Sequence, residues 1–163
     1  MKERIISELR CMMREPVRPI IIMFLFAAGG IITWLATDGI LFVWKEFCHP
    51  PFSMPIALIF AHWIIIYILF ALLSFRYSAL SCCGEACLRC TVGYLATLFW
   101  CPLMFLSCGC LITLLSLVLS VFHILWALAT CNRRSAVTVL ISIFLIASEI
   151  YYMYLTVGFF AAN

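Results

Sequence analysis

The chain has 163 residues, of which 67% are hydrophobic and 10% charged, and its formal net charge is +3. Soluble domains are about 45–50% apolar and about 25% charged, so this composition excludes a water-soluble globular protein. It predicts an integral, multi-pass membrane protein. The length allows one membrane domain, residues 19–163, behind a short leader at residues 1–18.

The leader is basic and amphipathic. Apolar residues such as Ile5 and Leu9 recur at helical spacing, and Pro16 and Pro19 end the pattern. Two interpretations stay open: a helix lying on the inner leaflet, or a solvated segment that only orients the first span. The apolar stretch that follows is longer than the core of a signal peptide, about 7–15 residues, so we expect an uncleaved anchor.

Five apolar stretches predict five transmembrane helices in an all-α bundle. Crossing a bilayer takes about 20 apolar residues, and lipid leaves only helices and closed barrels with satisfied backbones. The segment from Thr91 to Thr130 is long enough for two spans, and we divide it at Ser107-Cys108-Gly109-Cys110. The predicted spans are about residues 20–37, 54–75, 91–106, 111–130 and 136–160.

Basic residues lie almost entirely on one side of this five-span arrangement. Nine of the ten Lys and Arg residues lie in the leader, in residues 76–90 or in residues 131–135. Lys45 is the exception. Because cytoplasmic loops carry an excess of Lys and Arg, we expect a cytoplasmic N-terminus and an outer C-terminus.

Residues 76–90 contain the densest group of reactive side chains in the sequence, which we expect in a cytoplasmic loop. Cysteines next to a span are acylation substrates, a CxxC pair can supply two zinc ligands, and unmodified thiols are the third interpretation. The acylation candidates are Cys82, Cys83, Cys87 and Cys90. On the outer side, Cys48, Cys108 and Cys110 could form a disulfide or remain free thiols.

Three ionisable side chains fall deep within predicted spans: His62, His123 and Glu149. An ionised carboxylate at that depth costs on the order of 2.5–3.5 kcal/mol, so Glu149 either stays protonated or pairs with a cationic partner. Counting along the helices places His62 at a similar depth, with His123 second. Both interpretations predict that Glu149 faces the bundle interior. The pair could relay protons, anchor a ligand, or form a structural hydrogen bond.

Motifs for catalysis are missing from the sequence. It has no GxGxxG, Walker-type, HExxH or GxSxG pattern, and it has no Gln and only two Asn. We therefore expect no catalytic residues, no cofactor and no nucleic-acid partner, and the metal site stays the minor alternative above. These absences favour a non-enzymatic protein.

Part of the chain resembles the tryptophan-rich sensory protein and translocator protein family of five-helix membrane proteins. The matching positions are Gly29-Gly30, Trp44, Pro50-Pro51, Pro55, Trp63 with Tyr67, and Trp100-Cys101-Pro102-Leu103. Differences are Phe52 near a position where the family has tryptophan, the missing Gln and Asn of the third span, and an outer first loop. The resemblance implies a cavity for a sterol, porphyrin or similar flat apolar ligand, lined partly by Trp44, Trp63 and Tyr67.

Two functional expectations follow. The first is a protein that acts through contacts with membrane lipids, other membrane proteins or further copies of itself. The second is a binder or carrier of a small apolar ligand, such as a sterol, porphyrin or lipid. In the second, His62, Glu149, Trp44, Trp63 and Tyr67 would line the site.

Overall fold

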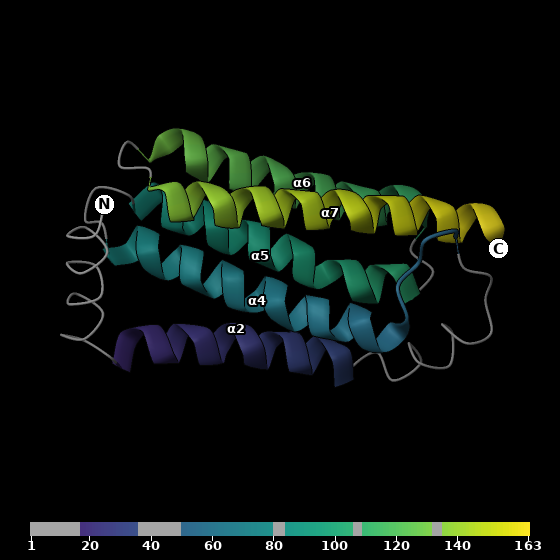
Figure 1. Cartoon of the computed structure of the whole chain (residues 1–163), viewed down its shortest axis with the longest axis horizontal. Coiled ribbons are helices and arrows are strands. Elements are labelled where there is room, and N and C mark those ends of the chain that lie inside the picture. Colours follow the sequence, from purple (N-terminus) through teal and green to yellow (C-terminus); the bar gives the residue numbers. More distant parts are fainter. Residues whose placement is uncertain (1–16, 36–49, 80–83, 106–108, 132–134) are drawn as a thin grey trace.

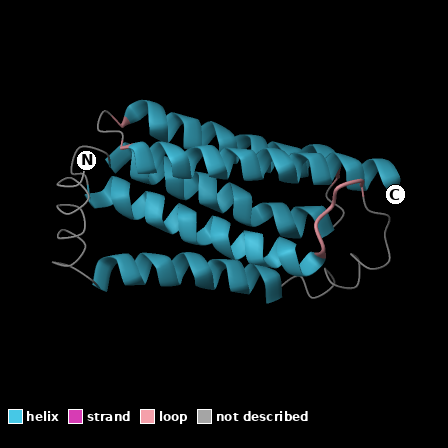
Figure 2. Ribbon diagram, in the orientation of Figure 1, coloured by secondary structure: helices cyan, strands magenta, loops and turns pink. Residues whose placement is uncertain are grey.

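A computed structural model describes residues 17–35, 50–79, 84–105, 109–131 and 135–163, and all regular structure in these ranges is helical. The helices run up and down in chain order, and together they form a bundle (Figures 1 and 2). They are α2 (Val17–Leu35), α4 (Ile56–Ala79), α5 (Gly84–Phe105), α6 (Cys110–Thr130) and α7 (Ala136–Ala162). Four of them, α4 to α7, are long and apolar enough to cross a membrane.

The helices coincide with the predicted spans within a few residues, except at the start of α5. This helix begins at Gly84, seven residues before the predicted start at Thr91, so Cys87 and Cys90 lie on a helix and not in a loop. The difference has a local cause. Glu85 suits the positive end of the helix dipole and lies 3.5 Å from Arg89, one turn later. Glu85 and Arg89, the charged residues that suggested a loop, therefore belong to the first turns of α5.

The predicted division of the long apolar segment is confirmed. Helix α5 ends at Phe105 and α6 begins at Cys110. Gly109 precedes α6 with a φ angle of 91°, which L-residues with a side chain rarely adopt. A glycine at this position therefore lets the chain reverse between two helices.

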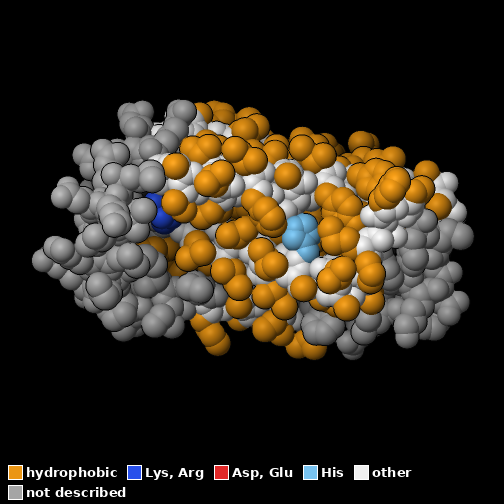
Figure 3. Space-filling model, in the orientation of Figure 1, with side chains coloured by type: hydrophobic (Ala, Val, Ile, Leu, Met, Phe, Trp, Pro, Cys, Tyr) orange, Lys and Arg blue, Asp and Glu red, His pale blue; other side chains and the backbone are white. Residues whose placement is uncertain are grey.

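Large apolar side chains cover the outside of the bundle. Each helix exposes at least one that is 56–70% accessible: Phe24 on α2, Leu58 on α4, Phe99 on α5, Leu111 on α6 and Leu140 on α7. In Figure 3, hydrophobic side chains extend over nearly all of the described surface between the two ends. Such a surface is unfavourable in water and suits hydrocarbon.

Aromatic rings fill the centre where α4, α5 and α7 meet. Trp63 lies 5.1 Å from Trp100 and 5.2 Å from Tyr152, and Trp100 lies 4.8 Å from Tyr152, measured between ring centroids. These tilted contacts lie in the range that aromatic pairs prefer. The Trp100 indole N–H donates to Thr156 Oγ1 at 2.8 Å, so the buried ring has no unpaired donor.

Helix α2 packs on this core through two glycines and one phenylalanine. The Tyr94 hydroxyl donates to the Phe26 carbonyl oxygen at 2.7 Å, and the two rings stack at 4.1 Å. A Cβ atom at Gly29 would collide with the Tyr94 hydroxyl, and one at Gly30 with the Tyr67 ring. Small residues let helices approach closely, which is the main source of packing energy in lipid.

Gly30→Ala is therefore expected to lower stability by about 1–3 kcal/mol, because the buried Tyr67 ring has to move out of its packed position. The matched control is Gly84→Ala, where an added Cβ meets nothing within 4 Å. Thermal unfolding of the purified protein in detergent measures both. Equal melting temperatures for the two variants would contradict the close packing of α2.

Candidate intramembrane polar site

The carboxyl group of Glu149 on α7 meets hydroxyl groups from two other helices. Thr97 Oγ1 on α5 lies 2.5 Å from Glu149 Oε1, and Ser120 Oγ on α6 lies 3.0 Å from the same oxygen. The two hydroxyl oxygens are 2.8 Å apart, and Thr97 Oγ1 also lies 3.1 Å from the Gly93 carbonyl oxygen. Three helices thus share one hydrogen-bonded cluster, which we call the Glu149 cluster: Glu149, Thr97 and Ser120.

Glu149 faces the bundle interior, as predicted, and its side chain is 0% exposed. Its second oxygen, Oε2, is buried and has no hydrogen-bond partner among the described residues. No cationic side chain in that part of the chain forms an ion pair with it. A buried acid held only by hydroxyl groups differs from the charged pair that the sequence suggested.

His62 on α4 forms a separate network with α7. The Ser148 hydroxyl donates to the Phe144 carbonyl oxygen at 2.9 Å, so its oxygen accepts from His62 Nε2 at 3.0 Å. His62 Nδ1 lies 3.2 Å from the Tyr152 hydroxyl oxygen, so both ring nitrogens have a hydroxyl partner on α7.

In the described part of the chain, His62 and Glu149 do not form the predicted pair, because their hydrogen bonds go to different partners. His62 contacts Ser148, the residue before Glu149, on the side of α7 that faces α4. Glu149 points to α5 and α6 instead. Neighbouring residues on a helix point in directions about 100° apart, and this separates the two networks.

Trp63 and Tyr67, the two predicted aromatic ligand contacts that the structure describes, are buried within the protein. Both are 7% exposed, and their rings lie 5.3 Å apart in an edge-to-face contact. Trp63 belongs to the central aromatic cluster, and Tyr67 lies over Gly30 and 5.6 Å from Tyr94. Trp44 lies outside the described residues.

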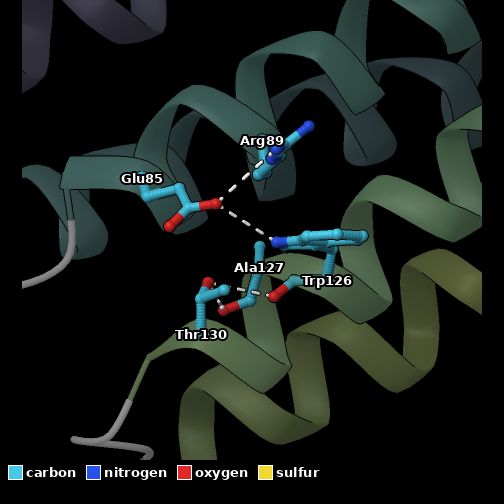
Figure 4. Close-up of polar contacts among 5 residues, drawn as sticks. All are labelled: Glu85, Arg89, Trp126, Ala127 and Thr130. Carbon is cyan, nitrogen blue, oxygen red and sulfur yellow. Dashed lines mark hydrogen bonds and ion pairs between the residues drawn. The ribbon is translucent and has the colours of Figure 1, made fainter.

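A second polar group, which the sequence did not single out, joins α5 and α6 near one end of the bundle (Figure 4). Glu85 Oε1 accepts from the Trp126 indole N–H at 3.2 Å and lies 3.5 Å from the Arg89 guanidinium. The guanidinium lies over the Trp126 ring, 4.7 Å from its centroid. At the same end, Arg76 donates to Ser135 Oγ at 2.7 Å, and Ser135 caps α7 by accepting from the Thr138 amide.

The described cysteines of the acylation group differ in access. Cys90 is 0% exposed, and its thiol lies 3.8 Å from the Phe70 carbonyl oxygen on α4. Cys87 is partly exposed and donates to the Ser74 carbonyl oxygen. Acylation of Cys90 would require α4 and α5 to separate. Cys82 and Cys83 lie outside the described residues, as do residues 1–16, Cys48 and Cys108.

A double-mutant cycle tests the Glu149 cluster. Ser120→Ala and Glu149→Met each remove the same interhelical hydrogen bond, so their combined effect should be less than additive. The expected coupling energy is about 0.6 kcal/mol and at most about 1.7 kcal/mol, as for other interhelical bonds in membranes. Denaturation in mixed micelles measures it.

The control cycle pairs His62→Phe with Glu149→Met. Because the described networks of these two residues are separate, the effects should add to within about 0.5 kcal/mol. A coupling energy as large as that of the Ser120 cycle would show that His62 and Glu149 interact directly.

Comparison with known proteins leaves the chain without a family assignment. No protein-family model matches it, and no curated protein matches it. The resemblance to the tryptophan-rich sensory protein and translocator protein family thus stays a prediction, and the function is argued from the geometry of this chain.

Proposed function

We propose that this chain is a non-enzymatic, five-span membrane protein that acts through lateral contacts with lipids, other membrane proteins or further copies of itself. In this proposal α2 is the first span, and α4 to α7 are the other four. The N-terminus faces the cytoplasm and the C-terminus faces the opposite side.

The apolar outer surface carries this proposal. Large hydrophobic side chains are exposed on every described helix, and they surround the bundle between its two ends. The chemistry that this surface offers to a partner is van der Waals packing with acyl chains or with another apolar helix. Lateral contact is the function that such a surface supports best.

The interior supports the same proposal, because its polar and aromatic groups are largely occupied by one another. Glu149 contacts Thr97 and Ser120, and His62 contacts Ser148 and Tyr152. A catalytic site instead holds groups poised toward a substrate.

An alternative function is the binding of a small apolar ligand. It is supported by the aromatic groups beside Gly30, since Trp63 and Tyr67 occupy the positions that the family resemblance implies for a ligand. A ligand would enter by displacing α2, whose contacts with the core are the stacked Phe26–Tyr94 pair and the two glycines.

The proposed orientation can be measured with reporter fusions. A reporter inserted after residue 81 should be cytoplasmic, and one at the C-terminus should lie outside, because nine of the ten Lys and Arg residues fall in segments that the five-span arrangement places on one side. Arg76 and Arg89 belong to these segments. A cytoplasmic C-terminus would rule out the five-span arrangement.

A thermal-shift screen of the purified protein distinguishes the two functions. If the protein acts through lateral contacts, its melting temperature should follow the bilayer lipid supplied and show no saturable response to sterols or porphyrins. A specific ligand at saturation, about 100 times its Kd, would stabilise by about 2.7 kcal/mol.

The variant that decides between them is Trp63→Phe, and the matched control is Trp126→Phe, which alters a more exposed tryptophan on α6. A saturable shift that Trp63→Phe weakens and Trp126→Phe leaves unchanged would establish the ligand binder and overturn the lateral-contact proposal.

A further inference from the structure

We propose that the Glu149 cluster is an intramembrane proton-binding site, and that protons reach it from the basic end of the bundle along the seam between α5 and α6. This goes beyond lateral contact with lipids or proteins, and it stands on separate observations. The ligand is a single exchangeable proton, and the group that binds it is the Glu149 carboxyl.

Two facing rows of residues form the seam. On α5, Glu85, Arg89, Gly93 and Thr97 follow one another at four-residue intervals, and on α6 the facing residues are Trp126, His123 and Ser120. Residues three or four apart share one face of a helix. The twelve residue steps from Glu85 to Thr97 span about 18 Å, so the seam reaches from the bundle end deep into the apolar region.

Contacts between the rows occur at each level. Glu85 accepts from the Trp126 indole, and Arg89 lies over the same ring. A Cβ atom built on Gly93 would lie 3.5 Å from the His123 Cβ and 3.4 Å from the Ser120 carbonyl oxygen. A Cβ atom would thus be in van der Waals contact with α6, so the two helices pack closely beside His123, one step before Glu149.

Three buried polar atoms along this seam have no hydrogen-bond partner among the described residues: Arg89 Nε near the bundle end, and His123 Nδ1 and Glu149 Oε2 deeper inside. The side chains of His123 and Glu149 are 7% and 0% exposed. Leaving a buried polar atom unpaired costs about 1–3 kcal/mol, so such atoms are rare unless they serve a purpose. Ser120, one turn from His123 on α6, contacts Glu149 and so lies between the two along the seam.

Counting protons favours a protonated carboxyl group. Four contacts join the oxygens of Thr97, Ser120, Glu149 and the Gly93 carbonyl group. The hydroxyl groups supply two protons and can fill only two of these contacts. A proton on Glu149 Oε1 fills a third by donating to Thr97, which frees the Thr97 hydroxyl to donate to Gly93.

The other ionisable side chains around the cluster do not neutralise it. His62 and Tyr152 bond to each other, Tyr94 donates to Phe26, and the Cys90 thiol is directed to Phe70. Glu85 and Arg89 lie at the bundle end of the route and pair with each other. Among the described residues, His123 on α6 is therefore the titratable group between that pair and Glu149. In the loading step, a hydronium ion that enters the seam gives its proton to His123 Nδ1 and leaves as water. The imidazolium then passes a proton to the carboxylate, forming the O–H bond and restoring neutral His123.

Infrared spectroscopy of the full-length protein in lipid nanodiscs tests both parts of the proposal. At neutral pH the spectrum should contain the C=O band of a protonated carboxylic acid, lost in Glu149→Gln and retained in Glu85→Gln, the control acid at the bundle end. On transfer to D₂O the band should shift as the proton exchanges. His123→Phe should slow this exchange by about 10²-fold, the usual effect of losing a proton-transferring side chain, and His62→Phe should leave it unchanged.

Three results would overturn the proposal. A Glu149 that gives only carboxylate bands at neutral pH is not a protonated site, and a band that never shifts in D₂O is not exchangeable. Equal exchange rates in His123→Phe and His62→Phe would refute the route. If Glu149→Gln does not fold, Ser120→Ala serves to assign the C=O band to Glu149. Loss of the hydrogen bond between Ser120 and Glu149 should shift the frequency of this band. A band that stays at the same frequency would refute the site.

Discussion

A polar side chain in hydrocarbon has no water to bond with, so it must find its partner on a neighbouring helix or on its own backbone. This constraint organises α5, α6 and α7 around Glu149. Thr97 and Ser120 reach the same carboxyl oxygen from two helices, and Trp100 reaches Thr156 one level away. The hydrophobic effect, which packs the cores of soluble proteins, is weak between helices in lipid. These interhelical hydrogen bonds therefore select which helix faces meet.

Helix α2 is held to the bundle by a different kind of contact from the three helices around Glu149. Its contacts include ring stacking by Phe26, the close approach of Gly29 and Gly30, packing of Ile22 on the core, and one hydrogen bond to a backbone carbonyl group. Such contacts depend on shape and not on paired charges. The bundle therefore combines a core joined by side-chain hydrogen bonds with one helix held mainly by van der Waals packing.

The two proposals for this chain use different parts of the same architecture. Lateral contact needs only the apolar exterior, whereas proton binding needs the interior seam between α5 and α6. Deep in the seam, two buried atoms, Glu149 Oε2 and His123 Nδ1, have no hydrogen-bond partner among the described residues. A purely structural hydrogen-bond cluster would leave neither atom unpaired at a cost of about 1–3 kcal/mol each.

Composition and hydropathy by themselves determined the class of this protein, the approximate helix bounds and the reversal at Gly109. These follow from local requirements: a span needs a minimum number of apolar residues, and a tight reversal needs a glycine. The burial of Glu149 was also predictable, because an acid cannot face lipid without a large cost.

Only the tertiary structure decided which residues surround Glu149. Depth along the helices suggested His62 as the partner of Glu149, yet the Glu149 side chain points to Thr97 and Ser120. The rotation of α7 about its axis sets the direction of this side chain, and depth does not. Thr97 and Ser120 look like ordinary small residues in apolar stretches, and their backbone bonds within one helix would have satisfied them equally well. The start of α5 at Gly84 was hidden for a related reason, since Glu85 and Arg89 find their partner in Trp126, 41 and 37 residues away along the chain. Contacts between distant segments depend on how whole helices rotate and pack, and a local pattern does not contain that information.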